Sequence, residues 1–186
     1  MNPPLAAAEA ARRILDSIAT QPALRVPLDD ALGSVLAEAV VSPLNIPPWT
    51  NSAMDGYAAR AEDVRGASVE QSIVLRVVEQ IAAGQFPART IGPGECARIF
   101  TGAPLPDGAD SVIRQEDTDY AVEQVQVRSD RDAGVNIRRA GEDIRLGTEV
   151  LHAGDEVTPA RLGVLASIRR PPDGVPTSAS GDPRQW

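Results

Sequence analysis

Three short segments of this chain place carboxylate, hydroxyl and guanidinium groups beside turn-forming residues. They are residues 47–58, 100–110 and 136–144. Each combines glycine or proline, which restrict how a loop can run, with polar side chains that a loop can present. Because functional side chains are often carried on loops held by a rigid scaffold, these segments predict a polar functional site.

Asp55 is the main candidate in the first segment. It lies between Met54 and Gly56, shortly after two consecutive prolines. A carboxylate in this place could orient a substrate, hold a cation or accept a proton. It could instead accept backbone N–H groups to shape a turn, as aspartate often does before glycine. Ser52 offers the same choice between a ligand contact and a turn cap.

Thr101 is the candidate in the second segment. It follows the apolar pair Ile99-Phe100 and precedes Gly102, so we expect it at a strand end with its hydroxyl exposed. Gly102 would let a ligand approach the backbone closely. The alternative is an ordinary threonine that stabilises a turn.

The third segment combines arginine and carboxylate side chains, at Arg138, Arg139, Glu142 and Asp143. One arginine could bind a phosphate through two parallel hydrogen bonds while Asp143 faces a cleft. The alternative is a cluster of surface ion pairs with little energetic value.

Other residues that could do chemistry have plainer interpretations. We expect Glu116 and Asp117 to form a solvated turn. His152 has no cysteine or histidine partner at metal-ligand spacing, which argues against a zinc site there. Cys96, the single cysteine, has no nearby base in the sequence and is expected to be a small core residue.

The composition narrows the class of protein. A net charge of −8 makes the chain a poor candidate for binding nucleic acid. All 18 basic residues are arginine, which excludes Schiff-base lysine chemistry and a Walker-type lysine. No apolar run is long enough to cross a membrane, and one cysteine cannot form an internal disulfide. We therefore expect a cytoplasmic protein without a membrane partner.

The elements that must position the three segments fall into two patterns. The flanks mix helix and strand, with a helix at residues 5–20, a helical turn at 26–33, a strand at 35–41 and another at 149–151. A last helix is expected at 160–167, with Thr158 as N-cap and Pro159 at the first helical position. The middle holds short strands separated by turns, which favours a small β barrel or sandwich; we expect them at 73–77, 96–100, 111–115 and 122–127.

Taken in order, the three segments resemble the molybdopterin molybdenumtransferases, the MoeA and gephyrin E-domain family. The resemblance extends over residues 5–168. It implies a mixed α/β and β fold, with an elongated, discontinuous α/β linker or dimerisation domain at residues 1–45 and 141–168. A small β-barrel-like domain is inserted at 46–140. Residues 169–186 are rich in structure breakers and are expected to be a disordered tail.

The family resemblance also implies a function. Its members insert molybdate into adenylated molybdopterin and release AMP, with Mg²⁺ assisting. Onto this sequence it carries a catalytic set and a substrate-binding set, and it assigns no metal ligand. The catalytic set is Asp55, Thr101 and Asp143, and the substrate-binding set is Ser52, Gly102, Arg138 and Glu142. Trp49 and Thr50 replace the Phe-Asp pair typical of many relatives, which removes one acidic contact.

The family site lies between the β module of one subunit and a large α/β domain of its partner, so a homodimer is expected. The sequence contains no counterpart of that α/β domain, which we interpret as a natural truncation or frameshift. Two hypotheses follow. The chain could form half of an insertase site that a separate α/β partner completes. It could instead be a non-catalytic dimerisation or interaction module, or a truncated remnant.

Overall fold

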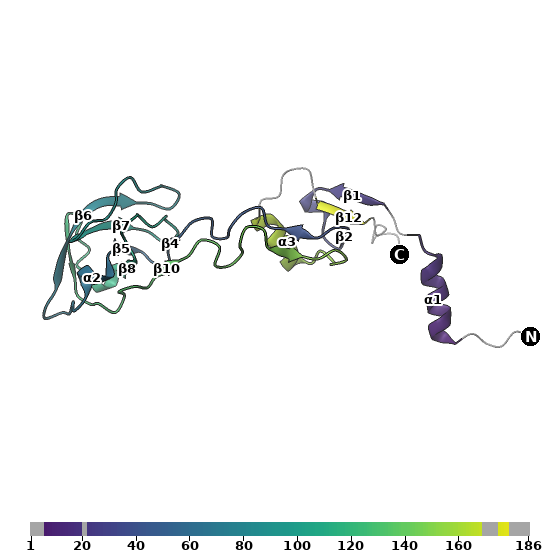
Figure 1. Cartoon of the computed structure of the whole chain (residues 1–186), viewed down its shortest axis with the longest axis horizontal. Helices are drawn as coiled ribbons and strands as arrows, with labels where there is room; N and C mark the ends of the chain where they lie inside the picture. Colours follow the sequence, from purple (N-terminus) through teal and green to yellow (C-terminus); the bar gives the residue numbers. More distant parts are fainter. Residues whose placement is uncertain (1–5, 20–21, 169–174, 179–186) are drawn as a thin grey trace, which may run out of the picture. The chain divides into compact units, whose positions relative to one another are not determined.

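The computed structural model describes residues 6–19, 22–168 and 175–178, the last four as backbone only. The chain divides into two compact units (Figure 1). The first joins Met1–Pro43 to Gly147–Trp186, and the second is Leu44–Leu146. The sequence analysis placed these boundaries after residues 45 and 140. All three polar segments lie in the second unit.

A five-stranded sheet forms the frame of the second unit, in the order β8-β5-β7-β6-β9. The strands β6 and β7 are parallel and the other neighbours antiparallel. Their bounds are β5 Gly56–Ala59, β6 Ile73–Ile81, β7 Glu95–Ile99, β8 Ser111–Arg114 and β9 Gln124–Val127. Each predicted strand of the middle region is therefore present, with ends shifted by a few residues.

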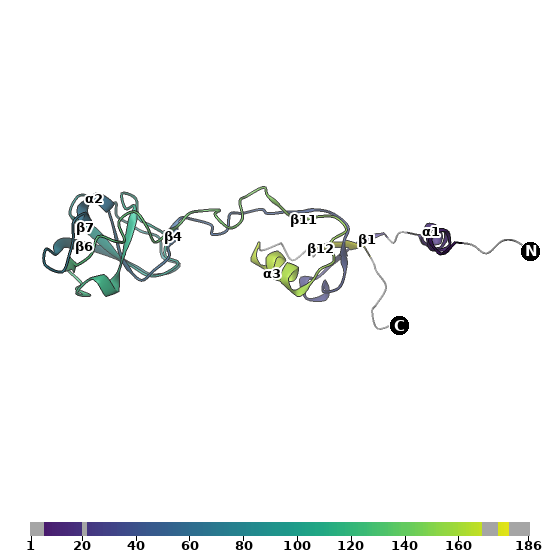
Figure 2. The same cartoon turned by 90° about the horizontal axis from the view of Figure 1, so that it is seen from below.

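Both faces of this sheet are buried at β5, β7 and β8. Neighbouring residues on a strand point to opposite faces, and Tyr57 and Ala58 accordingly join two different apolar clusters. Tyr57 packs with Cys96 and with Val64 of the short helix α2, Ala61–Val64. That helix lies beside the sheet in both views (Figure 1; Figure 2). The rigid scaffold that the polar loops need is this doubly buried sheet.

Two small elements complete the second unit near the polar loops. A two-stranded pair joins β4, Asn51–Ser52, to β10, Ile137–Arg138, in antiparallel register. A short 3-10 helix, η2 at Gln115–Asp117, follows β8 directly. Both carry residues of the predicted site or their immediate neighbours.

The first unit is mixed α/β. A three-stranded antiparallel sheet has the order β1-β12-β2, and a second pair joins β11 to β3. The elements are α1 Ala7–Ser17, β1 Ala23–Val26, η1 Leu28–Asp30, β2 Val35–Leu36, β3 Val40–Val41, β11 Glu149–Leu151, α3 Pro159–Ser167 and β12 Val175–Ser178. No helix in the described ranges is both long and apolar enough to span a membrane.

The expectations for this unit are confirmed in outline, with three differences, of which the first is that β1 was not expected. The hydroxyl of Thr158 accepts the backbone N–H of Arg161 at 3.4 Å, so the predicted N-cap of α3 is present. The strand expected at 35–41 is two separate strands, each pairing in a different sheet. Within the expected disordered tail, residues 175–178 form β12, because strands on both sides satisfy their backbone; the remainder of 169–186 lies outside the described residues.

Candidate functional site

Asp55 and Thr101 are joined by two hydrogen bonds. The backbone N–H and the hydroxyl of Thr101 each donate to Oδ1 of Asp55, at 2.8 Å. The carbonyl oxygen of Asp55 accepts the backbone N–H of Gln115 at 3.0 Å. The backbone N–H of Thr101, then its hydroxyl, and more weakly the charge of Arg98 hold the pKa of Asp55 below its ordinary value. Asp55 is therefore ionised at neutral pH.

The single hydroxyl proton of Thr101 is directed to Asp55. The hydroxyl oxygen keeps only acceptor capacity toward a ligand. Thr101 therefore positions and stabilises the Asp55 carboxylate.

Gly102 and Ser52 hold the backbone of the two loops together. The N–H of Gly102 donates to the carbonyl of Ser52 at 2.9 Å. Gly102 has φ +83°, a conformation that strains other residues, and it has open space around it. The Ser52 side chain is fully buried, and its hydroxyl donates to the carbonyl of Met54 at 2.5 Å. The buried hydroxyl of Ser52 therefore shapes the turn before Asp55, and a substrate contact by Ser52 stays a prediction.

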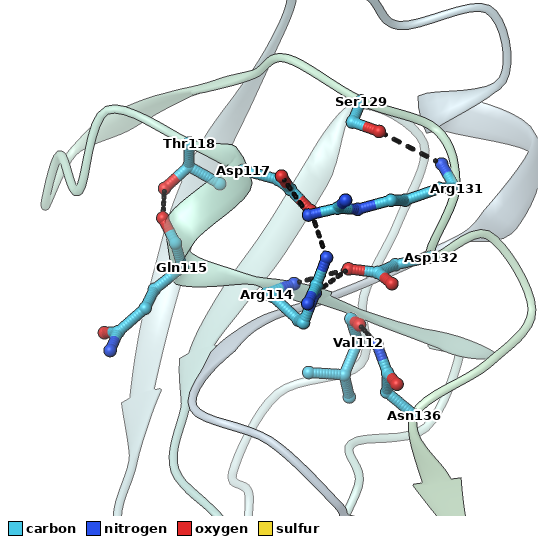
Figure 3. Close-up of polar contacts among 9 residues, drawn as sticks. All are labelled: Val112, Arg114, Gln115, Asp117, Thr118, Ser129, Arg131, Asp132 and Asn136. Carbon is cyan, nitrogen blue, oxygen red and sulfur yellow. Dashed lines mark hydrogen bonds and ion pairs between the residues drawn. The ribbon is translucent and has the colours of Figure 1, made fainter.

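Asn136 brings the third segment to the other two. Its carbonyl accepts the backbone N–H of Ala53, and its side-chain amide donates to the carbonyl of Val112, both at 2.9 Å (Figure 3). Asn136 has φ +65°, which asparagine tolerates better than most residues. The next residues pair with β4, so Ile137 lies opposite Ser52. These contacts bring the three segments together.

Arg138, Glu142 and Asp143 form an exposed ion-pair cluster. Nε of Arg138 donates to Glu142 at 2.6 Å, and its Nη2 donates to Asp143. The Glu142 side chain, and then Asp143, raise the pKa of Arg138. The backbone N–H of Arg139 first, and then the Arg138 side chain, lower the pKa of Glu142. This arrangement is the ion-pair alternative that the sequence left open, because Asp143 faces Arg138. A phosphate that binds Arg138 would have to displace a carboxylate from the guanidinium.

A polar network behind the site was missed by sequence reasoning. Arg114 donates from its backbone N–H and its Nε to Asp132 at 3.1 and 3.2 Å, and from Nη2 to Asp117 at 3.1 Å (Figure 3). Arg131 also binds Asp117, at 2.6 and 2.7 Å. The Asp117 side chain is only 14% exposed, so the prediction of a solvated turn is wrong for Asp117. Burial raises its pKa, an effect that Arg114 opposes.

The sequence contains no pattern that predicts this network. Residues 128–132 read Arg-Ser-Asp-Arg-Asp, a pattern that also fits an exposed charged turn. Only the fold brings this segment beside β8. The network anchors the stretch that leads to Asn136 and so indirectly positions the third loop.

Two open grooves lie on the second unit. One of about 440 Å³ is bordered by β6 together with Arg98, Phe100, Tyr120 and Val122. The other, of about 380 Å³, is lined by residues 49–50, 86–90, 104–105 and 107. In the second groove the rings of Trp49 and Phe86 meet edge to face, with centroids 5.0 Å apart. Trp49, a departure from the family pattern, therefore has a packing role there.

The remaining candidates from the sequence are Cys96 and His152. Cys96 is fully buried, and burial raises the pKa of its thiol to about 12, as expected of a core cysteine. The His152 side chain is 75% exposed, with Nδ1 2.5 Å from a carboxylate oxygen of Glu149. Within the described ranges, no group of three or more His, Cys, Asp and Glu side chains is arranged so that it could hold a metal ion.

Comparison with known proteins gives matches of sequence and of structure. The family model for the MoeA N-terminal region (domain I and II) matches residues 5–168. Molybdopterin molybdenumtransferase 2 of Mycobacterium tuberculosis H37Rv is 48% identical over 145 residues, which are 78% of this chain and 36% of that protein. Molybdopterin molybdenumtransferase of Staphylococcus aureus MRSA252 is 35% identical over 164 residues, 88% of this chain and 39% of the relative.

A solved structure agrees. The crystal structure of the molybdopterin biosynthesis moeA protein from Pyrococcus horikoshii OT3 has a TM-score of 0.82 and 34% identity, over 91% of this chain and 45% of that one. The chain spans little more than a third of the length of the curated relatives it matches.

Proposed function

We propose, from the premise that this chain belongs to the family of the MoeA N-terminal region, that it forms the part of a molybdopterin molybdenumtransferase site that positions the pterin substrate. The supporting observation is the ionised Asp55, held by Thr101 where the three polar loops meet. The substrate would be adenylated molybdopterin, into which molybdate is inserted with release of AMP. Residues outside the matched third of the relatives would supply the rest of the site.

The task of such a site is mainly orientation and electrostatics, because it must bring an anionic pterin and a tetrahedral oxyanion together. Oδ1 of Asp55 is occupied by Thr101, whereas Oδ2 has no hydrogen-bond partner among the described residues. An ionised carboxylate with one free oxygen can accept an N–H group of a pterin ring. Asp55 would thereby set the orientation of the substrate.

Arg138 would bind the phosphate by exchanging partners. Its two carboxylate contacts lie at the surface, where ion pairs contribute little to stability. A phosphate could replace Asp143 at Nη2 while Glu142 continues to hold Nε. Asp143 would then be released to face the substrate, which is the role that the family resemblance implies.

Mg²⁺ could bind to the carboxylates of these loops without a site made entirely of protein ligands. Mg²⁺ is commonly held by one or two carboxylates together with water and substrate phosphate. Asp55 is the carboxylate with a free oxygen in the loops, and Asp143 is available once displaced. When bound, the ion would neutralise phosphate charge.

A chimaera tests the function without assuming that the isolated chain turns over. The matched region of the Mycobacterium tuberculosis relative is replaced by residues 5–168 of this chain, and AMP release and active cofactor are followed with adenylated molybdopterin, molybdate and Mg²⁺. We expect the chimaera to be active and its Asp55→Asn variant to lose at least about ten-fold in rate, since one strong charged contact corresponds to about that factor.

The matched control is Asp16→Asn, an exposed carboxylate on α1. It should leave the rate unchanged. An inactive chimaera that is folded, or equal rates for Asp55→Asn and the unchanged chimaera, would contradict the proposal. Turnover by the isolated chain would show that it carries a complete site, and activity only after mixing with a separate α/β domain would identify a split site.

We also propose that two copies of the chain associate. The helix α1 has no buried residue, and the apolar side chains of Ile14, Leu15 and the C-cap residue Ile18 are 62 to 68% exposed. Such a stripe is the face that an amphipathic helix normally buries. Light scattering after size exclusion should give a dimer that Leu15→Arg dissociates, whereas Asp16→Asn should not change the mass.

A further inference from the structure

Arg98 is a half-buried cation that has no carboxylate partner among the residues that the structure describes. Of the arginines that the structure describes, the others without an ion pair are all exposed at the surface. A charged group withdrawn from water is normally paired or otherwise compensated. The position of Arg98 on β7 therefore calls for an explanation.

Its neighbours hold the guanidinium rigidly without cancelling its charge. Nη1 donates to the hydroxyl of Tyr57 at 2.7 Å, and Nη2 donates to the side-chain oxygen of Gln115 at 2.6 Å. The guanidinium carbon lies 4.9 Å from the centroid of the Tyr57 ring and 5.5 Å from that of Phe100. A guanidinium has five N–H donors, so three have no partner among the described residues.

Arg98 lines the groove of about 440 Å³. It is bordered by apolar side chains, among them Phe100, Tyr120 and the 78% exposed Val122, and by polar groups to a similar extent. This volume falls in the range of small-molecule sites, which combine apolar walls with a few fixed polar groups. Glu79 also lines the groove, but its two carboxylate oxygens already accept the backbone N–H groups of Ala88 and Arg89.

We propose that this groove is a binding site for an aryl phosphate, a planar apolar ring that bears a phosphate monoester. The phosphate would accept the unpartnered N–H groups of Arg98, because a guanidinium fork matches phosphate oxygens in geometry as well as in charge. The ring would lie against Phe100 and Tyr120. The site uses none of the residues assigned to the proposed reaction, although the charge of Arg98 also acts on Asp55. Binding is measured directly and without turnover, so the two proposals can fail separately.

Titration of the full chain with phenyl phosphate tests the site. Binding is measured by calorimetry and through the NMR signals of the arginine Nε–H groups. We expect one saturable site and a shift of the Arg98 signal. Inorganic phosphate should bind at least about ten-fold more weakly, because it cannot use the apolar walls, and benzoate should be weaker because it presents fewer oxygens.

Two rim variants provide the matched comparison. Val122→Asp places a negative charge at the groove and should weaken phenyl phosphate by about ten-fold or more. Val69→Asp makes the same change at a valine that is 76% exposed and does not line the groove, so it should bind like the unchanged chain. Arg98→Lys, which keeps the charge but loses the fork, should weaken binding and remove the shifted Nε–H signal.

Several results would overturn the proposal. Absence of saturable binding would do so, as would equal affinity in Val122→Asp and Val69→Asp. Equal affinity for inorganic phosphate would show that only an adventitious ion binds. Equal affinity for benzoate would contradict the assignment of phosphate. Arg98→Lys is informative only if that variant folds. Val122→Asp changes only an exposed side chain, so the test can be decided without Arg98 variants.

Discussion

Thr101 donates both its backbone N–H and its hydroxyl to a single carboxylate oxygen of Asp55, at 2.8 Å in each case. The two residues are 46 positions apart in the sequence. This contact orients one carboxylate, keeps it ionised and leaves its second oxygen available. Thr101 thereby positions Asp55.

Thr101→Val should raise the pKa of Asp55. The valine keeps the backbone N–H but removes the hydroxyl, which is one of the two groups that chiefly lower that pKa. Because the pKa is lowered in the folded state, the stabilisation exists above the unfolded pKa and is lost as pH falls through the folded value. The free energy of unfolding of the variant should be about 1 kcal/mol lower near neutral pH. It should also decrease less than that of the unchanged chain as the pH is lowered.

Carboxyl NMR titration of Asp55, together with denaturant unfolding at several pH values, measures both effects. Thr90→Val is the control, since Thr90 is exposed and its hydroxyl makes no hydrogen bond within the described residues. An unchanged Asp55 pKa in Thr101→Val would show that the hydroxyl contact is absent in solution.

Gly56→Ala should be strongly destabilising. A Cβ at Gly56 would lie 2.0 Å from the carbonyl oxygen of Ile113 on the neighbouring strand, far inside van der Waals contact. Strand separation would have to increase directly after Asp55, at a cost of about 3 kcal/mol. Gly163→Ala is the matched change: its Cβ meets open space on the exposed face of α3, and it should stabilise by up to about 1 kcal/mol. Chemical denaturation measures the free energy of unfolding of both variants. Similar values would contradict the close approach of β5 and β8 at Gly56.

Asp132→Ala should destabilise the second unit by about 2 kcal/mol. Asp132 is only 6% exposed and accepts two hydrogen bonds from Arg114, whose backbone N–H would lose its partner. The neighbouring Glu116 is exposed, so Glu116→Gln should change stability by no more than about 0.5 kcal/mol. Amide exchange of the Asn136 segment should also become faster in Asp132→Ala alone.

His152 should titrate above the ordinary histidine value. The hydrogen bond to Glu149 is the largest cause of its raised pKa, followed by the charge of Glu149. With a raised folded pKa, the stabilisation is fully present below the unfolded value and disappears as pH rises through the folded one. Because His152 is the single histidine, one ring signal reports the titration by proton NMR. Glu149→Gln should lower that pKa, whereas Glu38→Gln, at another exposed position, should not.

Much of the fold was accessible from local patterns. Alternating apolar residues predicted strands such as β6 and β9, and the Thr158-Pro159 pair marked the start of α3, because these signals depend on near neighbours in the chain. The separation of residues 35–41 into two strands and the pairing of β12 depend on partners far away in the sequence.

For the candidate site, the sequence by itself determined which loops matter: Asp55, Thr101 and Arg138 stand in segments whose residue types already indicate polar chemistry and the family. The tertiary structure decided what each group does. It buried Ser52, directed the Thr101 hydroxyl to Asp55 and paired Arg138 with both carboxylates. It also placed Arg98 in a groove, with no carboxylate partner in the described part of the chain. The physical reason is that a residue type sets which hydrogen bonds and charges are possible, whereas partner distance and exclusion of water, which choose among them, arise only when distant segments pack together.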